Sequence, residues 1–180
     1  RVIMTGNEAI ALGAYEAGVS VGCAYPGTPS TEILENLSRY EGVNCNWSAN
    51  EKTALEEGIG ASMEGARVLV AMKHVGVNVA ADPLLTLSYT GVGGGLVLIS
   101  ADDPGMHSSQ NEQDNRHYAR FAKIPLLEPS DSEEARDYVG IALDLSEKFD
   151  TPVMLRSATR ISHSRSTLVP GKREEHEITG

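Results

Sequence analysis

Two nearly continuous apolar runs constrain the fold more than any other feature of the sequence. Residues 66–72 read ARVLVAM and residues 95–100 read GLVLIS. A strand with one face in water alternates apolar and polar side chains, whereas a strand covered on both faces is apolar throughout. Both runs are also far shorter than the roughly 18 apolar residues that span a membrane. We therefore predict two central strands of a parallel sheet that has helices on both faces.

Shorter strands and helices alternate around these runs. Further strands are expected at residues 1–4, 19–25, 43–48, 124–128 and 152–157. Apolar residues at helical spacing predict helices at residues 6–18, 29–40, 51–64, 78–89 and 132–148. Asn7 is interpreted as a cap of the first helix, Pro29 as the first residue of the second, and Ser130–Glu133 as a capping box. This alternation predicts an α/β fold of three layers, with an open, mostly parallel sheet between helices.

Composition narrows the class of protein. With 180 residues, 41% of them hydrophobic and 22% charged, the chain has the size and composition of one soluble globular domain. Its net charge of −10 argues against binding to nucleic acid or to an anionic membrane. The sequence has no signal peptide, and we expect a cytoplasmic protein. Cys23 and Cys45 are expected to be buried reduced thiols, since a metal site held by this chain alone would need more ligands at closer spacing.

Ligands of open parallel sheets bind in the loops that follow the carboxyl ends of the strands. One such loop ends at Glu51, which opens a helix rich in alanine and glycine, so Glu51 is either a helix cap or a ligand-binding residue. His74 follows the buried strand at 66–72, and a structural and a functional role are equally open for it. The glycines at 91–95 precede a strand instead of following one, so we predict a turn and not a phosphate-binding loop.

The polar segment at residues 101–116 is too long for an ordinary connection, and such segments are usually functional. Asp102, Asp103, His107 and Asp114 lie in it, but their spacing matches no familiar set of metal ligands. We interpret them as a solvated acidic loop. No metal ligand is assigned anywhere in the chain, and a structural role is favoured for His163 as well.

Three longer stretches resemble a known family. The stretches AYPGTPSTEI, ANEKTALEEGIGASMEGARVLVAMKHVGVNVAADPL and SADDPGMHSSQNEQDNR are similar to the pyrimidine-binding domain of thiamine-diphosphate-dependent 2-oxoacid:ferredoxin oxidoreductases, in particular to alpha subunits of the indolepyruvate type. The resemblance covers residues 1–165 and implies the pyrimidine-type fold of thiamine-diphosphate-binding proteins. Residues 166–180 would be a charged linker or tail.

The resemblance assigns the site. It implies that Glu51 is the catalytic glutamate, which hydrogen-bonds N1′ of the aminopyrimidine ring of thiamine diphosphate, and such a carboxyl is expected to be buried. Gly27 and Thr28 would lie beside cofactor and substrate, and His74, Gly76 and Asn78 would belong to a loop that closes over the same pocket. Pyruvate-type members carry an arginine for the substrate carboxylate where this chain reads SADDPG.

The resemblance also implies a larger protein. This chain would supply only the pyrimidine half of the site, and a diphosphate-binding domain with Mg²⁺ and a ferredoxin-like segment with [4Fe-4S] clusters would lie elsewhere in the parent protein. The full enzyme would decarboxylate an aryl pyruvate oxidatively to an acyl-CoA, with a beta subunit, ferredoxin and CoA as partners, in a homo- or hetero-oligomer. The isolated domain would be inactive. The alternative is a stand-alone, non-catalytic relative that serves as an assembly or binding module.

Overall fold

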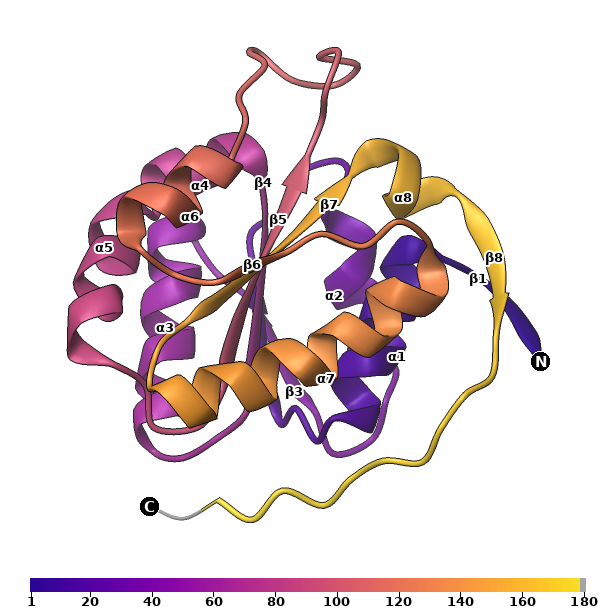
Figure 1. Ribbon diagram of the computed structural model, residues 1–180, viewed down its shortest axis with the longest axis horizontal. Helices are drawn as coiled ribbons and strands as arrows, with labels where there is room; N and C mark the ends of the chain where they lie inside the picture. The colour runs from indigo at the N-terminus through magenta and orange to yellow at the C-terminus, as the bar shows by residue number, and fades with distance from the viewer. Residues whose placement is uncertain (179–180) are drawn as a thin grey trace.

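The computed structural model describes residues 1–178 and consists of a six-stranded parallel sheet between two layers of helices (Figure 1). The strands follow the order β3-β2-β4-β5-β7-β6 across the sheet. Their bounds are β2 (Val21–Ala24), β3 (Asn44–Trp47), β4 (Val68–Lys73), β5 (Leu96–Asp102), β6 (Leu126–Leu127) and β7 (Val153–Ala158). The α/β fold class is therefore confirmed, and the two apolar runs are the neighbouring central strands β4 and β5.

Successive side chains of a strand point to opposite faces, so the apolar run in β4 fills two cores at once. Leu69 and Ala71 pack on one face and Val68, Val70 and Met72 on the other. The first face is covered by α1 (Gly6–Glu16), α2 (Thr31–Leu37) and α7 (Ser132–Phe149). The second is covered by α3 (Glu51–Met63), α4 (His74–Val79), α5 (Ala81–Thr90) and α6 (Arg116–Ala122).

Several elements differ from the sequence prediction. The single helix expected at 78–89 is two helices, α4 and α5, which meet at Ala80, and α4 begins directly at the end of β4. The first strand, β1 (Val2–Thr5), lies outside the main sheet and pairs antiparallel with β8 (Arg165–Leu168), which was not predicted. Two short helices, α6 and α8 (Thr159–His163), were also missed. Apolar content alone predicts a strand but does not say which partner it pairs with.

The interpretation of Asn7 as a cap was wrong. Thr5 caps α1: its side chain accepts a hydrogen bond from Glu8 N–H, and the Glu8 carboxylate accepts one from Thr5 N–H at 2.7 Å. Asn7 is buried in the first turn of the helix, and its amide donates to the carbonyl of Pro29 at 2.8 Å. It therefore links α1 to the loop after β2.

Two other helix starts are displaced from their predicted positions. Pro29 lies before α2, which begins at Thr31, and Thr28–Pro29 is a cis peptide bond. The N-cap of α7 is Asp131, whose side chain accepts from Glu134 N–H at 2.8 Å, while the Glu134 carboxylate accepts from Ser130; the expected capping box at Ser130–Glu133 is therefore replaced by a simple cap one residue later. The first helical residue of α2 thus lies two residues after the predicted one, and the cap of α7 lies one residue after the predicted one.

Residues 169–178 run back along the amino-terminal edge of the sheet (Figure 1). Gly171 N–H donates to the Glu16 carboxylate, and the Arg173 guanidinium lies 4.8 Å from the centre of the Tyr15 ring. The expected tail at 166–180 thus includes part of β8, while residues 179 and 180 lie outside the described residues. Among residues 1–178, no helix is long and apolar enough to cross a membrane.

Both cysteines are free thiols. Cys23 is buried, as expected, and burial raises its pKa to about 12. Cys45 was also expected to be buried, but it is only half-buried because β3 is the edge strand of the sheet; desolvation still raises its pKa to about 11. Both side chains therefore stay protonated at neutral pH and behave as packing groups.

Candidate functional site

The carboxyl ends of the parallel strands meet at one edge, and the predicted site residues follow three strands that are neighbours there. Gly27 and Thr28 follow β2, Glu51 follows β3, and His74 follows β4. Because β2 lies between β3 and β4, these loops are brought together although they span about 50 residues of sequence. This is the crevice position in which open parallel sheets bind ligands.

Glu51 is not the cap of its helix. Asn50 has that role, since its side chain accepts a hydrogen bond from Thr53 N–H at 2.9 Å. Within the described residues the Glu51 carboxylate has no hydrogen-bond partner, and it packs against Gly76 in α4. A Cβ built on Gly76 would lie 2.7 Å from Glu51 Oε1 and 2.6 Å from Glu51 Cγ. Glu51 was expected to be buried but is half-buried, and it follows β3, the edge strand of the sheet.

The turn after β2 is held by a set of short hydrogen bonds. Gly27 N–H donates to Thr31 Oγ1 at 2.9 Å, and the Ser30 hydroxyl donates to the Gly27 carbonyl at 2.7 Å. The Asn7 side chain, in α1, also fixes the turn by donating a hydrogen bond to the carbonyl of Pro29. Thr28 is exposed at its tip. Sequence reasoning missed Asn7 as a positioning residue, because its partner lies 22 residues away and no local pattern connects them.

Lys73, the last residue of β4, is a second residue that sequence reasoning did not single out. Its side chain lies beside Gly27, where a Cβ would meet Lys73 Cβ at 3.2 Å. The ammonium group donates to the carbonyl of Ser108, in the loop that follows β5. No carboxylate of residues 1–178 lies within ion-pair distance of it. A basic residue directly after a doubly buried strand was the available signal.

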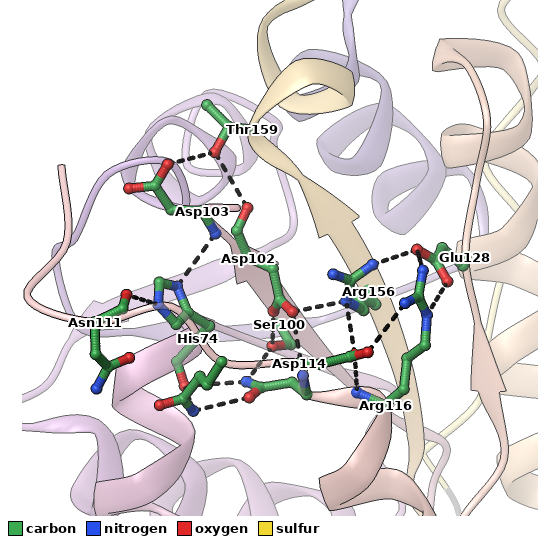
Figure 2. Close-up of polar contacts among 12 residues, drawn as sticks. His74, Ser100, Asp102, Asp103, Asn111, Asp114, Arg116, Glu128, Arg156 and Thr159 are labelled. Atoms are coloured by element: carbon green, nitrogen blue, oxygen red, sulfur yellow. Dashed lines mark hydrogen bonds and ion pairs between the residues drawn. The ribbon is translucent and has the colours of Figure 1, made fainter. Parts of the chain in front are cut away.

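The His74 ring faces the loop after β5 (Figure 2). It is fully buried, its Nδ1 accepts a hydrogen bond from Asp103 N–H at 3.2 Å, and its Nε2 lies 3.1 Å from the carbonyl of Asn111. A backbone carbonyl only accepts, so Nε2 must carry the proton and the ring is the neutral Nε2–H tautomer. Both ring nitrogens are therefore engaged by the loop.

Asn78 faces the same loop from the other end of α4. Its side chain exchanges hydrogen bonds of 2.9 Å with Gln113 and accepts one from the Tyr118 hydroxyl at 2.6 Å. Gly76, between His74 and Asn78 in the helix, faces Glu51 instead. The structure thus places α4 between the Glu51 carboxylate on one side and the loop after β5 on the other.

The interpretation of the acidic segment as a solvated loop was wrong for two of its members. Asp102 and Asp103 are only 1% and 2% exposed. Asp103 accepts hydrogen bonds from Ser108 N–H at 2.8 Å, Ser109 Oγ at 2.6 Å and Thr159 Oγ1 at 3.1 Å. Burial by itself would raise its pKa, but these hydrogen bonds outweigh burial and lower the pKa to about 2.

Asp102 forms a buried ion pair with Arg156 of β7, whose Nε lies 2.6 Å from Asp102 Oδ2 (Figure 2). Arg156 also contacts Glu128, which pairs with Arg116 at 2.7 Å. The hydrogen bond from Arg116 lowers the pKa of Glu128. The ion pair with Arg156 explains how Asp102 can be buried here, whereas Asp103 is held by neutral hydrogen-bond donors.

The remaining candidate side chains are at the surface, and of these Asp114 joins the edge of this network through Arg116, at 3.1 Å. Asp114 and His107 in the acidic segment are exposed, as is His163 in α8. The glycines at 91–95 form a turn at the amino-terminal edge, where the Ser62 hydroxyl donates to the Gly94 carbonyl at 2.6 Å. In the described part of the chain, no cluster of three or more His, Cys, Asp or Glu side chains is placed to hold a metal ion.

An open parallel sheet with polar loops at its carboxyl edge is the architecture of a ligand-binding α/β domain. The chain belongs to the family described as "Pyruvate flavodoxin/ferredoxin oxidoreductase, thiamine diP-bdg", whose model matches residues 12–179. The resemblance noted from the sequence is thereby confirmed.

Sequence identity to individual proteins of the family shows which subunits this chain is most similar to among those compared. The chain is 53% identical to indolepyruvate oxidoreductase subunit IorA of Archaeoglobus fulgidus, over 99% of this chain and 30% of that protein. It is 51% identical to the IorA subunit of Pyrococcus abyssi, over 96% of this chain and 27% of that protein. Ketoisovalerate oxidoreductase subunit VorB of Methanothermobacter thermautotrophicus is 26% identical over 85% of the chain and 46% of that protein. The chain therefore spans about 30% of the length of the IorA relatives.

A solved structure shares the fold. It is a 2-oxoglutarate:ferredoxin oxidoreductase from Magnetococcus marinus with 2-oxoglutarate, coenzyme A and succinyl-CoA bound, at a TM-score of 0.83 and 22% identity. The match covers 97% of this chain and 32% of that one. The predicted pyrimidine-type fold is thereby confirmed.

Proposed function

We propose that this chain is the pyrimidine-binding part of an indolepyruvate-type 2-oxoacid:ferredoxin oxidoreductase. The full protein would convert an aryl pyruvate to an acyl-CoA and pass electrons to ferredoxin. The identity of about 50% to IorA subunits over nearly the whole chain supports this choice of substrate class, since identity to the ketoisovalerate subunit is half as high. The non-catalytic alternative is not favoured, because these relatives are oxidoreductase subunits.

The observation that carries the proposal is the unpartnered Glu51 carboxylate packed on Gly76. An aminopyrimidine ring needs a carboxyl oxygen that no other donor occupies, and it needs a flat backbone surface nearby. Both requirements fit Glu51 and Gly76, so these residues would hold the pyrimidine half of thiamine diphosphate. When bound, thiamine diphosphate supplies a carbon nucleophile and stabilises the carbanion left by decarboxylation. Glu51 would share a proton between its carboxyl oxygen and ring nitrogen N1′.

Other residues would support the same pocket. Gly27 and Thr28 would line it from the turn after β2, and Asn7 would fix that turn. His74 and Asn78 would act through the loop that they hold. Residues 1–165 would form the pyrimidine-binding domain and 166–180 a charged tail. We assign Mg²⁺, the [4Fe-4S] clusters and the contacts to the beta subunit, ferredoxin and CoA to the rest of a cytoplasmic, oligomeric parent enzyme.

The test uses the full-length subunit with its partner subunit, assayed for ferredoxin reduction with an aryl pyruvate, 2-oxoisovalerate or 2-oxoglutarate. Glu51→Gln is expected to lower kcat about a hundredfold or more, because general acid–base groups contribute at least that much. The same variant should also bind thiamine diphosphate more weakly, as measured by calorimetry. Glu56→Gln is the matched control, since Glu56 lies on the same helix and is exposed, and its one ion pair among residues 1–178 is with Lys52, at 3.9 Å.

Preference among the substrates tests the finer proposal. An aryl pyruvate is expected to have the highest kcat/KM of the three oxoacids. Unchanged turnover in Glu51→Gln would refute the assigned role of Glu51. A wild-type enzyme that oxidises none of the oxoacids would refute the function itself.

A further inference from the structure

We propose that Lys73 binds the carboxylate of the 2-oxoacid substrate and thereby fixes the carbonyl carbon beside it. This inference rests on the function proposed above, because it needs an anionic substrate at the carboxyl edge of the sheet. The Lys73 ammonium group lies at the surface of the site and does not pack in the hydrophobic core.

The position of Lys73 carries the first part of the argument. Lys73 ends β4, between the turn with Gly27 and Thr28 on one side and the loop with Ser108 on the other. The missing Cβ of Gly27 lets the lysine stem lie close against the turn, because a methyl group there would meet Lys73 Cβ at 3.2 Å. The next residues of the chain form α4, which contacts Glu51 through Gly76. Lys73 therefore reaches the same edge as Thr28 and Glu51.

The second part is the state of its charge. An ammonium group has three donors, and the carbonyl of Ser108 takes one of them. A carbonyl is neutral, so it orients the group without cancelling its charge. Two donors and a full positive charge remain available to a ligand carboxylate.

Three other cations near this edge are already neutralised. Arg156 is held by Asp102 and Glu128, and Arg116 by Asp114 at 3.1 Å and Glu128 at 2.7 Å. Lys52, at the start of α3, pairs with Asp82 at 2.9 Å. In contrast, Lys73 has no acidic partner among residues 1–178. An exposed cation that is oriented but unpaired is the chemistry that recognises an anion.

A lysine also suits a bulky oxoacid. Its charge is compact and sits on a flexible stem, whereas a guanidinium is a planar group that demands one fixed approach. The stem of Lys73 is anchored at Gly27 while its tip points toward the loop, so the ammonium group can follow a carboxylate whose position shifts with the size of the side chain.

The experiment uses the cofactor-loaded full-length enzyme with its partner subunit. Three variants are compared, Lys73→Met, Lys73→Arg and the control Lys52→Met. The measurements are KM and kcat for an aryl pyruvate, and Kd in calorimetry for an unreactive 3-aryl propionate and for its neutral amide. Lys73→Met is expected to raise KM and the propionate Kd about tenfold or more, because a hydrogen bond to a charged group is lost. The amide Kd should stay within about twofold, Lys73→Arg should retain part of the affinity, and Lys52→Met should match wild type.

The outcomes separate this inference from the proposed function. If the wild-type enzyme does not oxidise any 2-oxoacid, the proposed function is refuted. Active wild type with unchanged KM and propionate Kd in Lys73→Met refutes only the role of Lys73, and so does an equal loss of affinity for propionate and amide. If Lys73→Met does not assemble, Lys73→Gln gives the same comparison with a polar side chain of similar length.

Discussion

The backbone of Gly76 lies directly against the side chain of Glu51, so that a methyl group at position 76 would overlap the carboxylate. On the opposite side of α4, the helix that contains Gly76, the side chains of His74 and Asn78 hydrogen-bond to the loop after β5. The Glu51 carboxylate and that loop are thus placed by opposite sides of α4. A substitution that moves α4 on the Glu51 side is therefore expected to disturb the loop after β5, and a substitution on the loop side is expected to disturb the position of the Glu51 carboxylate.

Gly76→Ala tests the first contact. Alanine favours the helix by about 1 kcal/mol, so a simple propensity effect would stabilise the protein. We expect instead that Glu51 is pushed aside, with turnover of the full enzyme and its affinity for thiamine diphosphate each falling about tenfold. Kinetics and calorimetry measure both quantities.

The matched control is Gly60→Ala in α3. A Cβ at Gly60 meets nothing within 4 Å, so this variant should gain helix stability and keep full activity. Cofactor affinity in Gly76→Ala equal to that of wild type would show that the Glu51 carboxylate is not held by this contact.

The His74 ring gives a second prediction, on proton position and loop stability. Its partners require hydrogen on Nε2 and a lone pair on Nδ1. Nitrogen NMR of the ring should therefore show the Nε2–H tautomer. His74→Ala should cost about 1–3 kcal/mol of unfolding free energy, because Asp103 N–H loses its buried acceptor.

Hydrogen exchange locates that effect. The Asp103 amide should exchange much faster in His74→Ala than in wild type, while amides at the centre of β4 keep their protection relative to global unfolding. Asn78→Ala is the control for α4, since the Asn78 side chain is exposed and its loss should cost less. Equal exchange of Asp103 in all three proteins would mean that the ring does not hold the loop.

The sequence was sufficient to predict the main parallel sheet and the loops at its carboxyl edge, but it did not predict which side chains meet. The apolar runs of β4 and β5 identify doubly covered strands without knowledge of any partner. Asn7 was misread, because its partner Pro29 belongs to another loop. Asp102 was assigned to solvent, because Arg156, which neutralises it, is 54 residues away. Contacts between residues far apart in the sequence depend on the order of the strands in the sheet, and the local periodicity of apolar residues does not reveal that order.

Asp103 gives a prediction on pH. Its pKa is lowered in the folded protein from 3.8 to about 2. The Asp103 carboxylate therefore stabilises the fold at any pH above about 4, and this contribution of about 2 kcal/mol is lost as the pH falls from about 4 to 2. Asp103→Asn lacks the charge at every pH. The difference in unfolding free energy between wild type and Asp103→Asn should be constant above pH 4 and should shrink below it. A difference that stays constant down to pH 2 would contradict the lowered pKa.

The Asp102–Arg156 pair gives the last prediction. Both side chains are buried, at 1% and 8% exposure, with 2.6 Å between Arg156 Nε and Asp102 Oδ2. Arg156→Met would leave Asp102 as an unpaired buried charge, and such losses cost about 3–5 kcal/mol of unfolding free energy. Asp102→Asn removes the charge instead and keeps an acceptor for Ser100. The double variant should therefore be more stable than Arg156→Met alone, so that a double-mutant cycle in denaturant gives a favourable coupling of more than about 1 kcal/mol. Additive losses in the cycle would mean that Glu128 is the effective partner of Arg156, because that carboxylate is in contact with the same guanidinium.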